Sequence, residues 1–200
     1  MIQTILFDLD GTLLDRNRSV KEFVESQYDR LISPLKPISK DVYVSRFLEL
    51  DNRGYVWKDR VYEQLVHEYH MTEITSESLL QDYLNHFKDW CIAFPHMLDM
   101  LQSLREKQLL LGIISNGRGR FQMDAICGLG IREFFDVILL SEWEGIKKPD
   151  LHIFLRAANR LGVSPHECVF VGDHPLNDVR AAQKAGMKTI WKRDANWQEP

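Results

Sequence analysis

The chain has 200 residues, 44% hydrophobic and 27% charged, which is ordinary for a globular protein with one domain or one core carrying an insertion. The formal net charge is −4 and the sequence contains no long basic run, which argues against nucleic acid as the main partner. An anionic ligand would therefore need cations placed locally around it.

The N-terminus has the pattern of a strand with an acid at position 8, so we expect no secretory signal. The longest apolar runs, such as residues 109–114, fall far short of the roughly 20 residues that span a bilayer. We therefore expect a cytoplasmic protein without a membrane partner. The three cysteines, Cys91, Cys127 and Cys168, are widely spaced, and we expect them to be reduced packing residues.

The chain opens with a strand and then changes character. Residues 5–7 form an apolar run that is short enough for one buried strand. Residues 16–91 then carry apolar side chains at helical spacing, which predicts four or so packed helices. This helical segment is inserted between the first strand and the rest of the chain.

From residue 95 onward, helix and strand patterns alternate. We predict helices over residues 97–107, 119–128, 149–161 and 176–185, and strands over residues 109–114, 135–140, 168–171 and 187–191. Strands that alternate with helices of this length indicate right-handed crossovers and a parallel sheet. We therefore predict an α/β protein with a Rossmann-like core domain from residues 1–15 and 92–200, and a helical domain from residues 16–91.

Two acids follow the first strand directly. Asp8 and Asp10 are separated by Leu9, and Gly11 then supplies a turn. Ligands of open α/β sheets bind at the carboxyl ends of the strands, and a hard cation such as Mg²⁺ would relieve the repulsion between two carboxylates. The alternative is an ordinary Asp-Gly turn at a strand end.

Three later loops carry polar side chains at equivalent places. Ser115 and Asn116, followed by Gly117, offer a hydroxyl and backbone N–H groups that suit an anion, although the same residues also form ordinary turns. Lys147 and Lys148 precede Pro149, and either could neutralise a phosphate or lie solvated on the surface.

The third of these loops follows the strand over residues 168–171. Asp173 is placed as Asp8 is, and we predict that it binds a metal. Asp178 lies near the start of the next helix, where an acid also favours the helix dipole. His174 is more typical of a loop residue than of a ligand beside hard carboxylates.

These segments resemble the signatures of the haloacid dehalogenase-like hydrolases. Asp-Leu-Asp-Gly-Thr at residues 8–12 matches the first signature, and the three later loops follow in the family's order, so the resemblance covers residues 2–191. The resemblance implies roles for eight residues. Asp8 is the nucleophile, Asp10 is the general acid and base, and Thr12 supports the geometry at the phosphate site. Ser115, Asn116 and Lys148 bind phosphate. Asp8, Asp173 and the backbone carbonyl of Asp10 bind Mg²⁺, and Asp178 orients the waters of the metal.

The function that the resemblance implies is a Mg²⁺-dependent phosphatase acting on a small phosphorylated metabolite through an aspartyl-phosphate, as a monomer or homodimer. A sugar phosphomutase would use the same intermediate, and a non-catalytic regulator would keep the fold without turnover. Haloacid dehalogenases proper lack the second acid, so Asp10 favours phosphate chemistry. The helical segment resembles a family cap, with Arg46, Arg53, Lys58 and Arg60 as candidates to reach the far end of the substrate.

Overall fold

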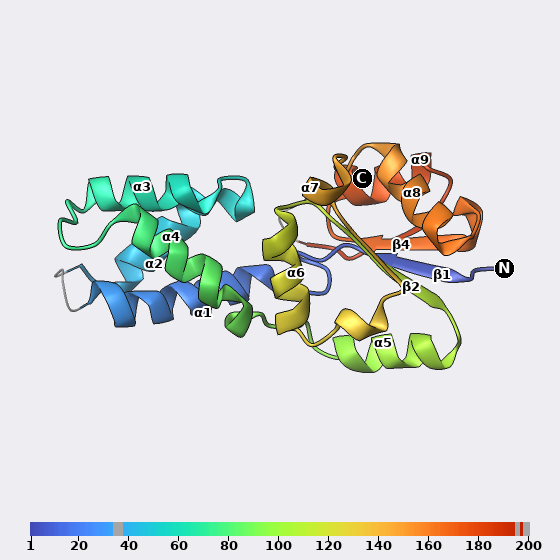
Figure 1. Ribbon diagram of the computed structural model, residues 1–200, viewed down its shortest axis with the longest axis horizontal. Coiled ribbons are helices and arrows are strands. Elements are labelled where there is room, and N and C mark those ends of the chain that lie inside the picture. Colours follow the sequence, from blue (N-terminus) through green and yellow to red (C-terminus); the bar gives the residue numbers. More distant parts are fainter. Residues whose placement is uncertain (34–37, 195–196, 198–200) are drawn as a thin grey trace. The chain divides into compact units, whose positions relative to one another are not determined.

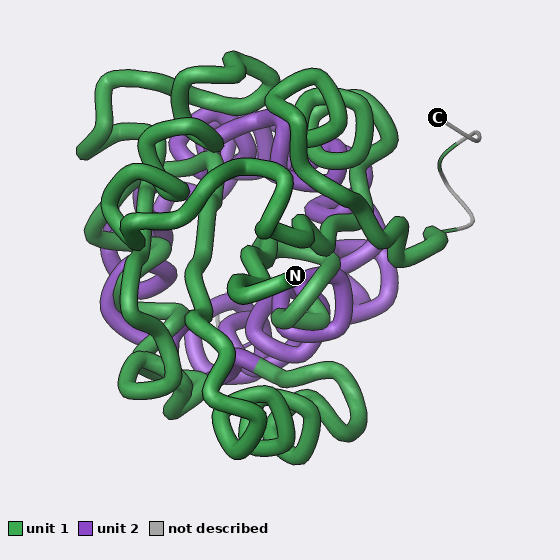
Figure 2. Tube along the Cα trace, turned by 90° about the vertical axis from the view of Figure 1, so that its right-hand side faces the viewer, with its two compact units in different colours: residues 1–15, 92–200 green, residues 16–91 purple. Residues whose placement is uncertain are grey.

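The computed structural model describes residues 1–33, 38–194 and 197, and the chain divides into two compact units (Figure 2). The core unit contains residues 1–15 and 92–200, and the helical unit contains residues 16–91. That the helical unit serves as a cap stays a prediction.

The core unit is built on a five-stranded parallel sheet in the order β3-β2-β1-β4-β5. Its strands are β1 (Thr4–Phe7), β2 (Leu110–Ser115), β3 (Val137–Leu140), β4 (Cys168–Gly172) and β5 (Lys188–Trp191). The predicted α/β fold is confirmed, and each strand lies within two residues of its predicted bounds.

The first strand lies at the centre of the sheet, which decides where the loops meet. Phe7 pairs with Ile113 of β2 on one side and with Val171 of β4 on the other. The residues that follow these three strands therefore emerge together at one edge of the sheet. Segments more than 100 positions apart in the chain become neighbours there.

Helices cover both faces of the sheet (Figure 1). The helices α8 (Leu151–Leu161) and α9 (Ala181–Lys184) lie on one face, and α5 (Met97–Glu106) lies on the other. The buried positions of α8 are Ile153, Phe154, Ala157 and Ala158, which is the apolar stripe of an amphipathic helix. The ring of Phe154 meets that of Phe170 edge-on, with 5.0 Å between their centres.

Two predicted helices differ from what is observed. Helix α8 begins at Leu151 rather than at Pro149, because the side chain of Asp150 accepts the His152 backbone N–H and caps it. The Lys148–Pro149 peptide before it is cis. The helix predicted over residues 176–185 is a π-helical segment, Pro175–Arg180, followed by α9. The helix α6 (Gly119–Gly128) has its predicted bounds, and a short helix α7 (Ser141–Glu144) was not predicted.

The helical unit contains α1 (Arg16–Gln27), α2 (Lys40–Asp51), α3 (Lys58–Glu68) and α4 (Ser76–His86) within its described residues. Aromatic rings fill its interior: the ring centres of Phe23 and Tyr83 are 5.0 Å apart, and those of Phe47 and Tyr62 are 5.4 Å apart. The helical unit therefore has a hydrophobic core of its own.

A buried ion pair also lies inside the helical unit. The carboxylate of Asp51 accepts from Arg16 at 2.8 Å and from the ammonium of Lys58, and both Asp51 and Lys58 are buried. One buried carboxylate thus compensates the buried Lys58 and the half-buried Arg16.

Within the described residues, no helix has both the length and the apolar composition needed to cross a bilayer. None of the three cysteines, all of which are described, forms a disulfide. Cys168 is buried and Cys91 is half-buried, but Cys127 is exposed, so the predicted packing role is wrong for Cys127. Its place near the end of α6 leaves its side chain uncovered.

Replacing Asp51 with alanine is expected to reduce the free energy of unfolding by about 3–5 kcal/mol, because it removes a buried carboxylate from its ion pairs with Lys58 and Arg16. Urea denaturation followed by circular dichroism measures the change. The control is Asp29→Ala, which removes the partner of Lys40 in an exposed pair and should leave stability nearly unchanged. Equal effects of the two substitutions would contradict the argument.

Candidate active site

The loop after β1 places one carboxylate in the interior and the next at the surface of the site. Asp8 is buried and follows the strand directly, and its backbone N–H donates to the carbonyl of Val171 at 2.9 Å. The hydroxyl of Thr12, also buried, donates to Asp8 Oδ2 at 3.3 Å. Asp10 is only half-buried.

Three carboxylates converge at this edge of the sheet. Oxygen atoms of Asp8, Asp173 and Asp178 lie within 4.8 Å of one another, and all three residues are buried. Asp8 follows β1, whereas Asp173 and Asp178 follow β4. The central position of β1 beside β4 therefore assembles the cluster from residues that are far apart in the sequence.

A buried lysine enters the same cluster. The ammonium of Lys148 donates to Asp8 Oδ1 at 2.7 Å and to Asp178 Oδ1 at 2.6 Å. Asn116 holds the backbone of this lysine: its amide donates to the Lys148 carbonyl at 2.9 Å, and its oxygen accepts the Lys148 N–H at 2.8 Å. Both ends of the Asn116 side chain are therefore used to position Lys148, while Lys147 is exposed.

The ionisation of these groups reflects their burial. Burial raises the pKa of Asp8 well above its usual range, against the opposing charge of Lys148, and Asp178 and Asp173 add to the rise. Burial and then the charge of Asp178 raise the pKa of Asp173 to about 6. Burial alone would lower the pKa of Lys148, but Asp178 and Asp8 reverse this and raise it. Lys148 therefore stays charged, whereas the raised pKa values of Asp8 and Asp173 oppose the ionisation of these two acids.

Two glycines permit the close approach of the acids. Gly11 has φ +84°, which disfavours other residues, and a Cβ there would lie 2.7 Å from Asp173 Oδ2. A Cβ on Gly172 would lie 2.5 Å from the side chain of Asp178. Any larger residue at either position would therefore push an acid of the cluster aside.

Gln122 on α6 is a site residue that the sequence analysis missed. Its amide nitrogen donates to Asp10 Oδ2 at 2.7 Å, to the Asn116 carbonyl at 3.0 Å and to Ser115 Oγ at 3.2 Å. Gln122 and Ser115 are both buried. The only available signal was a polar residue on a predicted helix directly after the Ser-Asn-Gly loop, and this is not specific.

The N–H groups of the loop after β2 have partners within the protein. The Gly117 N–H donates to Ser141 Oγ at 2.9 Å, and the Gly119 N–H donates to Glu142 Oε2 at 2.7 Å. The carboxylate of Glu142 thus occupies the start of α6, where the sequence analysis expected N–H groups open to an anion. The hydroxyl of Ser115 remains the anion-binding candidate of this loop.

Residues near the C-terminal end of the described chain contact Asp173 and the loop after β1. The indole N–H of Trp191 donates to the Asp173 carbonyl at 2.8 Å, and that of Trp197 donates to Asp173 Oδ2 at 3.3 Å. The ammonium of Lys192 donates to the Gly11 carbonyl at 2.8 Å. His174 Nδ1 accepts two backbone N–H groups, so this nitrogen acts as a helix cap.

The four basic candidates of the helical unit have different surroundings. Arg46 pairs with Glu68 at 2.6 Å, and the exposed Arg60 pairs with Glu63 at 2.9 Å. Arg53 is half-buried with φ +59°, and Lys58 is buried against Asp51. Lys58 is therefore part of the interior of this unit.

The carboxylate cluster fits a divalent cation. Three acids share one ion-paired lysine, Lys148, so their full ionisation leaves an excess of negative charge in a buried place. Carboxylate oxygens are the ligands that Mg²⁺ prefers. Asp8, Asp173 and Asp178 offer such oxygens, whereas the carboxylate of Asp10 lies with Gln122.

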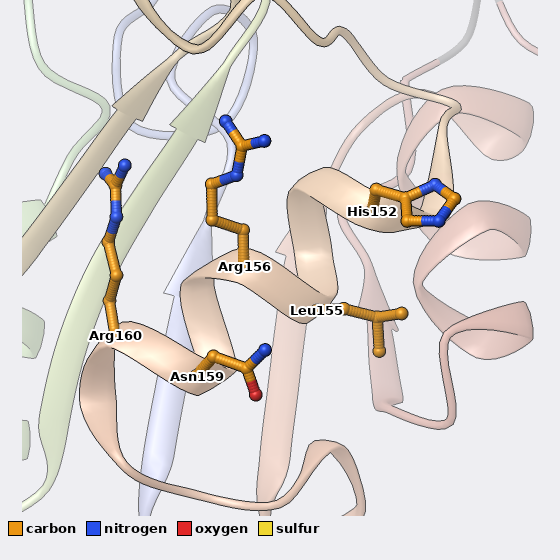
Figure 3. Close-up of a pocket in the computed structure, with 5 residues that line it drawn as sticks. All are labelled: His152, Leu155, Arg156, Asn159 and Arg160. Atoms are coloured by element: carbon orange, nitrogen blue, oxygen red, sulfur yellow. The ribbon is translucent and has the colours of Figure 1, made fainter.

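A surface hollow elsewhere on the core unit contains none of the predicted site residues. Its lining comes from α8 alone, as Figure 3 shows: His152, Leu155, Arg156, Asn159 and Arg160. Both of its arginines pair with Glu144 at 2.8 Å. These arginine charges are therefore already compensated within the fold.

Comparison with known proteins gives one family. The family model described as haloacid dehalogenase-like hydrolase matches residues 5–192. Glyceraldehyde 3-phosphate phosphatase of Pyrococcus furiosus is 29% identical over 203 residues, covering 99% of this chain and 83% of that protein. The protein of the same name from Methanopyrus kandleri is 30% identical over 218 residues, covering 100% of this chain and 87% of that protein.

Solved structures agree with this match. The crystal structure of a phosphatase from Thermococcus onnurineus, of the same family, superposes with a TM-score of 0.67 at 29% identity. The match covers 98% of this chain and 89% of that one. The likeness in fold therefore extends over nearly the whole of both chains.

Mg²⁺ is expected to raise the thermal midpoint of the wild-type protein, because a ligand that binds only the folded state stabilises it. Asp173→Asn should lose most of this increase, since it removes a negatively charged ligand from the cluster. Thermal melts with and without Mg²⁺ measure the effect. Asp124→Asn, which alters an acid paired with Arg120 on α6, is the control and should keep the response. An undiminished increase in Asp173→Asn would contradict the metal site.

The contribution of Asp173 to the free energy of unfolding of the metal-free protein is expected to fall as the pH rises from about 4 to about 6. Folded Asp173 holds its proton up to about pH 6, whereas in the unfolded chain it releases the proton near its usual value of 3.8. The unfolded state binds fewer protons in this interval, so rising pH favours it. The stability of Asp173→Asn relative to wild type should therefore grow across this interval and level off above it. Urea denaturation in EDTA tests this, and a constant difference would contradict it.

Proposed function

Because this chain belongs to the haloacid dehalogenase-like hydrolase family, we propose that it is a Mg²⁺-dependent phosphatase that hydrolyses a small phosphomonoester through an aspartyl-phosphate on Asp8. The observation that carries the proposal is the buried carboxylate of Asp8, with Lys148 Nζ 2.7 Å from Oδ1 and two further acids within 4.8 Å. A nucleophile of this kind needs its phosphoryl group neutralised and held in line.

The first step is transfer of the phosphoryl group to Asp8. A carboxylate oxygen of Asp8 bonds to phosphorus, and the bond between phosphorus and the ester oxygen breaks. Asp10 donates a proton to the departing oxygen, which leaves as an alcohol. Lys148 offsets negative charge on the phosphoryl oxygens, and the hydroxyl of Ser115 donates a hydrogen bond to one of them. Asn116 contributes by holding Lys148 in place.

The second step releases phosphate. Asp10, now ionised, takes a proton from a water molecule as the water oxygen bonds to phosphorus. The bond between phosphorus and Asp8 breaks, which restores the carboxylate and liberates inorganic phosphate. The hydroxyl of Thr12 keeps Asp8 oriented through its contact with Oδ2. Asp10 returns to its protonated form, so the cycle is complete.

The residues that would hold Mg²⁺ are Asp8, Asp173 and the backbone carbonyl of Asp10, with Asp178 orienting the waters of the metal. When bound, the cation supplies charge stabilisation to the phosphoryl oxygens. The raised pKa of Asp8 and of Asp173 supports this assignment, since both acids need a further positive charge to ionise together. Lys148 alone leaves that need unmet.

The alternative functions differ in the residues or the activator that each of them needs. Asp10 favours phosphoryl transfer over carbon–halogen cleavage, because protonation of a leaving alcohol needs a second acid. A sugar phosphomutase would use the same aspartyl-phosphate and would be activated by a bisphosphate. A regulator without turnover has no need for both Asp8 and Asp10. The names of the two archaeal relatives support a small phosphorylated metabolite as the substrate.

Asp8→Asn is expected to lower the hydrolysis of para-nitrophenyl phosphate by about a thousandfold or more, because loss of a covalent nucleophile removes the reaction path. Hydrolysis should also require Mg²⁺ in the wild-type protein. A colorimetric assay with Mg²⁺ and with EDTA measures both effects. The control is Asp124→Asn, and circular dichroism checks the fold. Normal turnover in Asp8→Asn would overturn the assignment of the nucleophile.

A screen of phosphorylated metabolites then identifies the substrate class. Glyceraldehyde 3-phosphate is the first compound to test because two relatives carry its name. Release of inorganic phosphate, which is expected for at least one small monoester, distinguishes a phosphatase from a phosphomutase. Activity that appears only when a sugar bisphosphate is added would favour the phosphomutase.

A further inference from the structure

Gln122 contacts two residues with different proposed roles, the general acid Asp10 and the phosphate-binding Ser115. Its amide nitrogen lies 2.7 Å from Asp10 Oδ2 and 3.2 Å from Ser115 Oγ, and it also contacts the carbonyl of Asn116 at 3.0 Å. Asp10 belongs to the loop after β1, and Ser115 ends β2. Gln122 is buried on α6, so its side chain is confined by packing.

The chemistry of the three acceptors fixes the orientation of this amide. A carboxylate and a backbone carbonyl only accept hydrogen bonds, so the NH₂ end of Gln122 faces them. The two N–H groups are shared among three oxygens, and the shortest contact is the one to Asp10. Ser115 Oγ receives a hydrogen bond, so its own hydroxyl proton is directed elsewhere and can be donated to a phosphoryl oxygen.

The backbone around Gln122 leaves little room for any other arrangement. A Cβ on Gly117 would lie 2.6 Å from the Gln122 amide nitrogen, so the loop passes directly against this side chain. The Gln122 backbone N–H donates to the Arg118 carbonyl at 2.9 Å, which anchors the residue in the first turns of α6. Gln122 is thus held at its amide by the Gly117 loop and at its backbone by the first turn of α6.

We propose that Gln122 is a positioning residue for the proton-transfer step, which holds Asp10 Oδ2 so that Oδ1 faces the leaving oxygen. This inference rests on the proposed function. Gln122 itself touches neither phosphorus nor the leaving group in this mechanism. It sets the carboxylate of Asp10 at a fixed place relative to the phosphate-binding Ser115, and a general acid acts only from such a place.

The test compares two substrates that differ in their need for a proton. An alkyl phosphate expels a poor leaving group and depends on Asp10, whereas para-nitrophenyl phosphate expels a stable anion and does not. The value of kcat/KM reports the steps up to departure of the leaving group, so the shared hydrolysis of aspartyl-phosphate does not obscure the comparison. The alkyl substrate is glyceraldehyde 3-phosphate, or glycerol 3-phosphate if that is the better substrate of the wild-type protein.

In Gln122→Met, which keeps the length of the side chain and removes its donors, kcat/KM for the alkyl phosphate should fall at least about tenfold more than for para-nitrophenyl phosphate. Gln122→Glu keeps the shape, replaces the donors by acceptors and should show the same selective loss. Gln183→Met removes an exposed amide donor to Thr189 and is the matched control. Equal losses on both substrates, or no loss, would overturn the positioning role.

Crystal structures of the wild-type protein and of Gln122→Met test whether Gln122 fixes the Asp10 side chain, and they do not require an active enzyme. If the wild-type protein hydrolyses no phosphomonoester of the screen, the proposed function fails, but the arrangement around Asp10 can still be observed. The expected result is an Asp10 side chain in one rotamer in the wild-type protein and displaced in the variant. An Asp10 side chain in the same single rotamer in both proteins would overturn the inference.

Discussion

The contacts of Lys148 with Asp8 and Asp178 are the constraint on which the rest of the site depends. A charged lysine is costly to bury unless carboxylates compensate it, and here two acids lie within 2.7 Å of its ammonium. Burial raises the pKa values of Asp8 and Asp173, and the neighbouring acids, which outnumber the lysine, add to the rise. The cluster therefore remains short of positive charge, a condition that suits a divalent cation.

The backbone around the cluster is arranged to keep these charges together. Gly11 and Gly172 have no side chain where Asp173 and Asp178 approach, and the Asn116 amide clamps the backbone of Lys148. Gly11, Gly172 and Asn116 each lie at the carboxyl end of a strand or in the loop that follows it. A parallel sheet brings such ends to one edge, so the fold concentrates acids that are far apart in an extended chain and repel one another once they are brought together.

The interior of the helical unit also contains buried charges that need compensation. Asp51 compensates both Arg16 and Lys58, so two of its charged side chains are committed to its internal structure. By sequence, Lys58 is one of four basic candidates to reach the far end of the substrate, together with Arg46, Arg53 and Arg60. Burial separates Lys58 from the exposed Arg60, because the distinction depends on which helices pack together and not on residue type.

The amino-acid sequence by itself determined the order of strands and helices, because hydrophobic periodicity is a local pattern that can be recognised in each segment without knowing the fold. It also indicated Asp8, Ser115 and Asp173, because each follows a predicted buried strand and strand ends converge in a parallel sheet, whereas Lys148 was selected over Lys147 by the family resemblance. Only the tertiary structure decided which polar residues of the helices join them. Gln122 donates to Asp10, which lies 112 positions away in the chain. Glu142 accepts the backbone N–H of Gly119 at the start of α6, where an anion could otherwise bind. Neither contact has a local signature, because a polar residue on a helix faces water in most folds and meets a buried partner only when packing brings one to it.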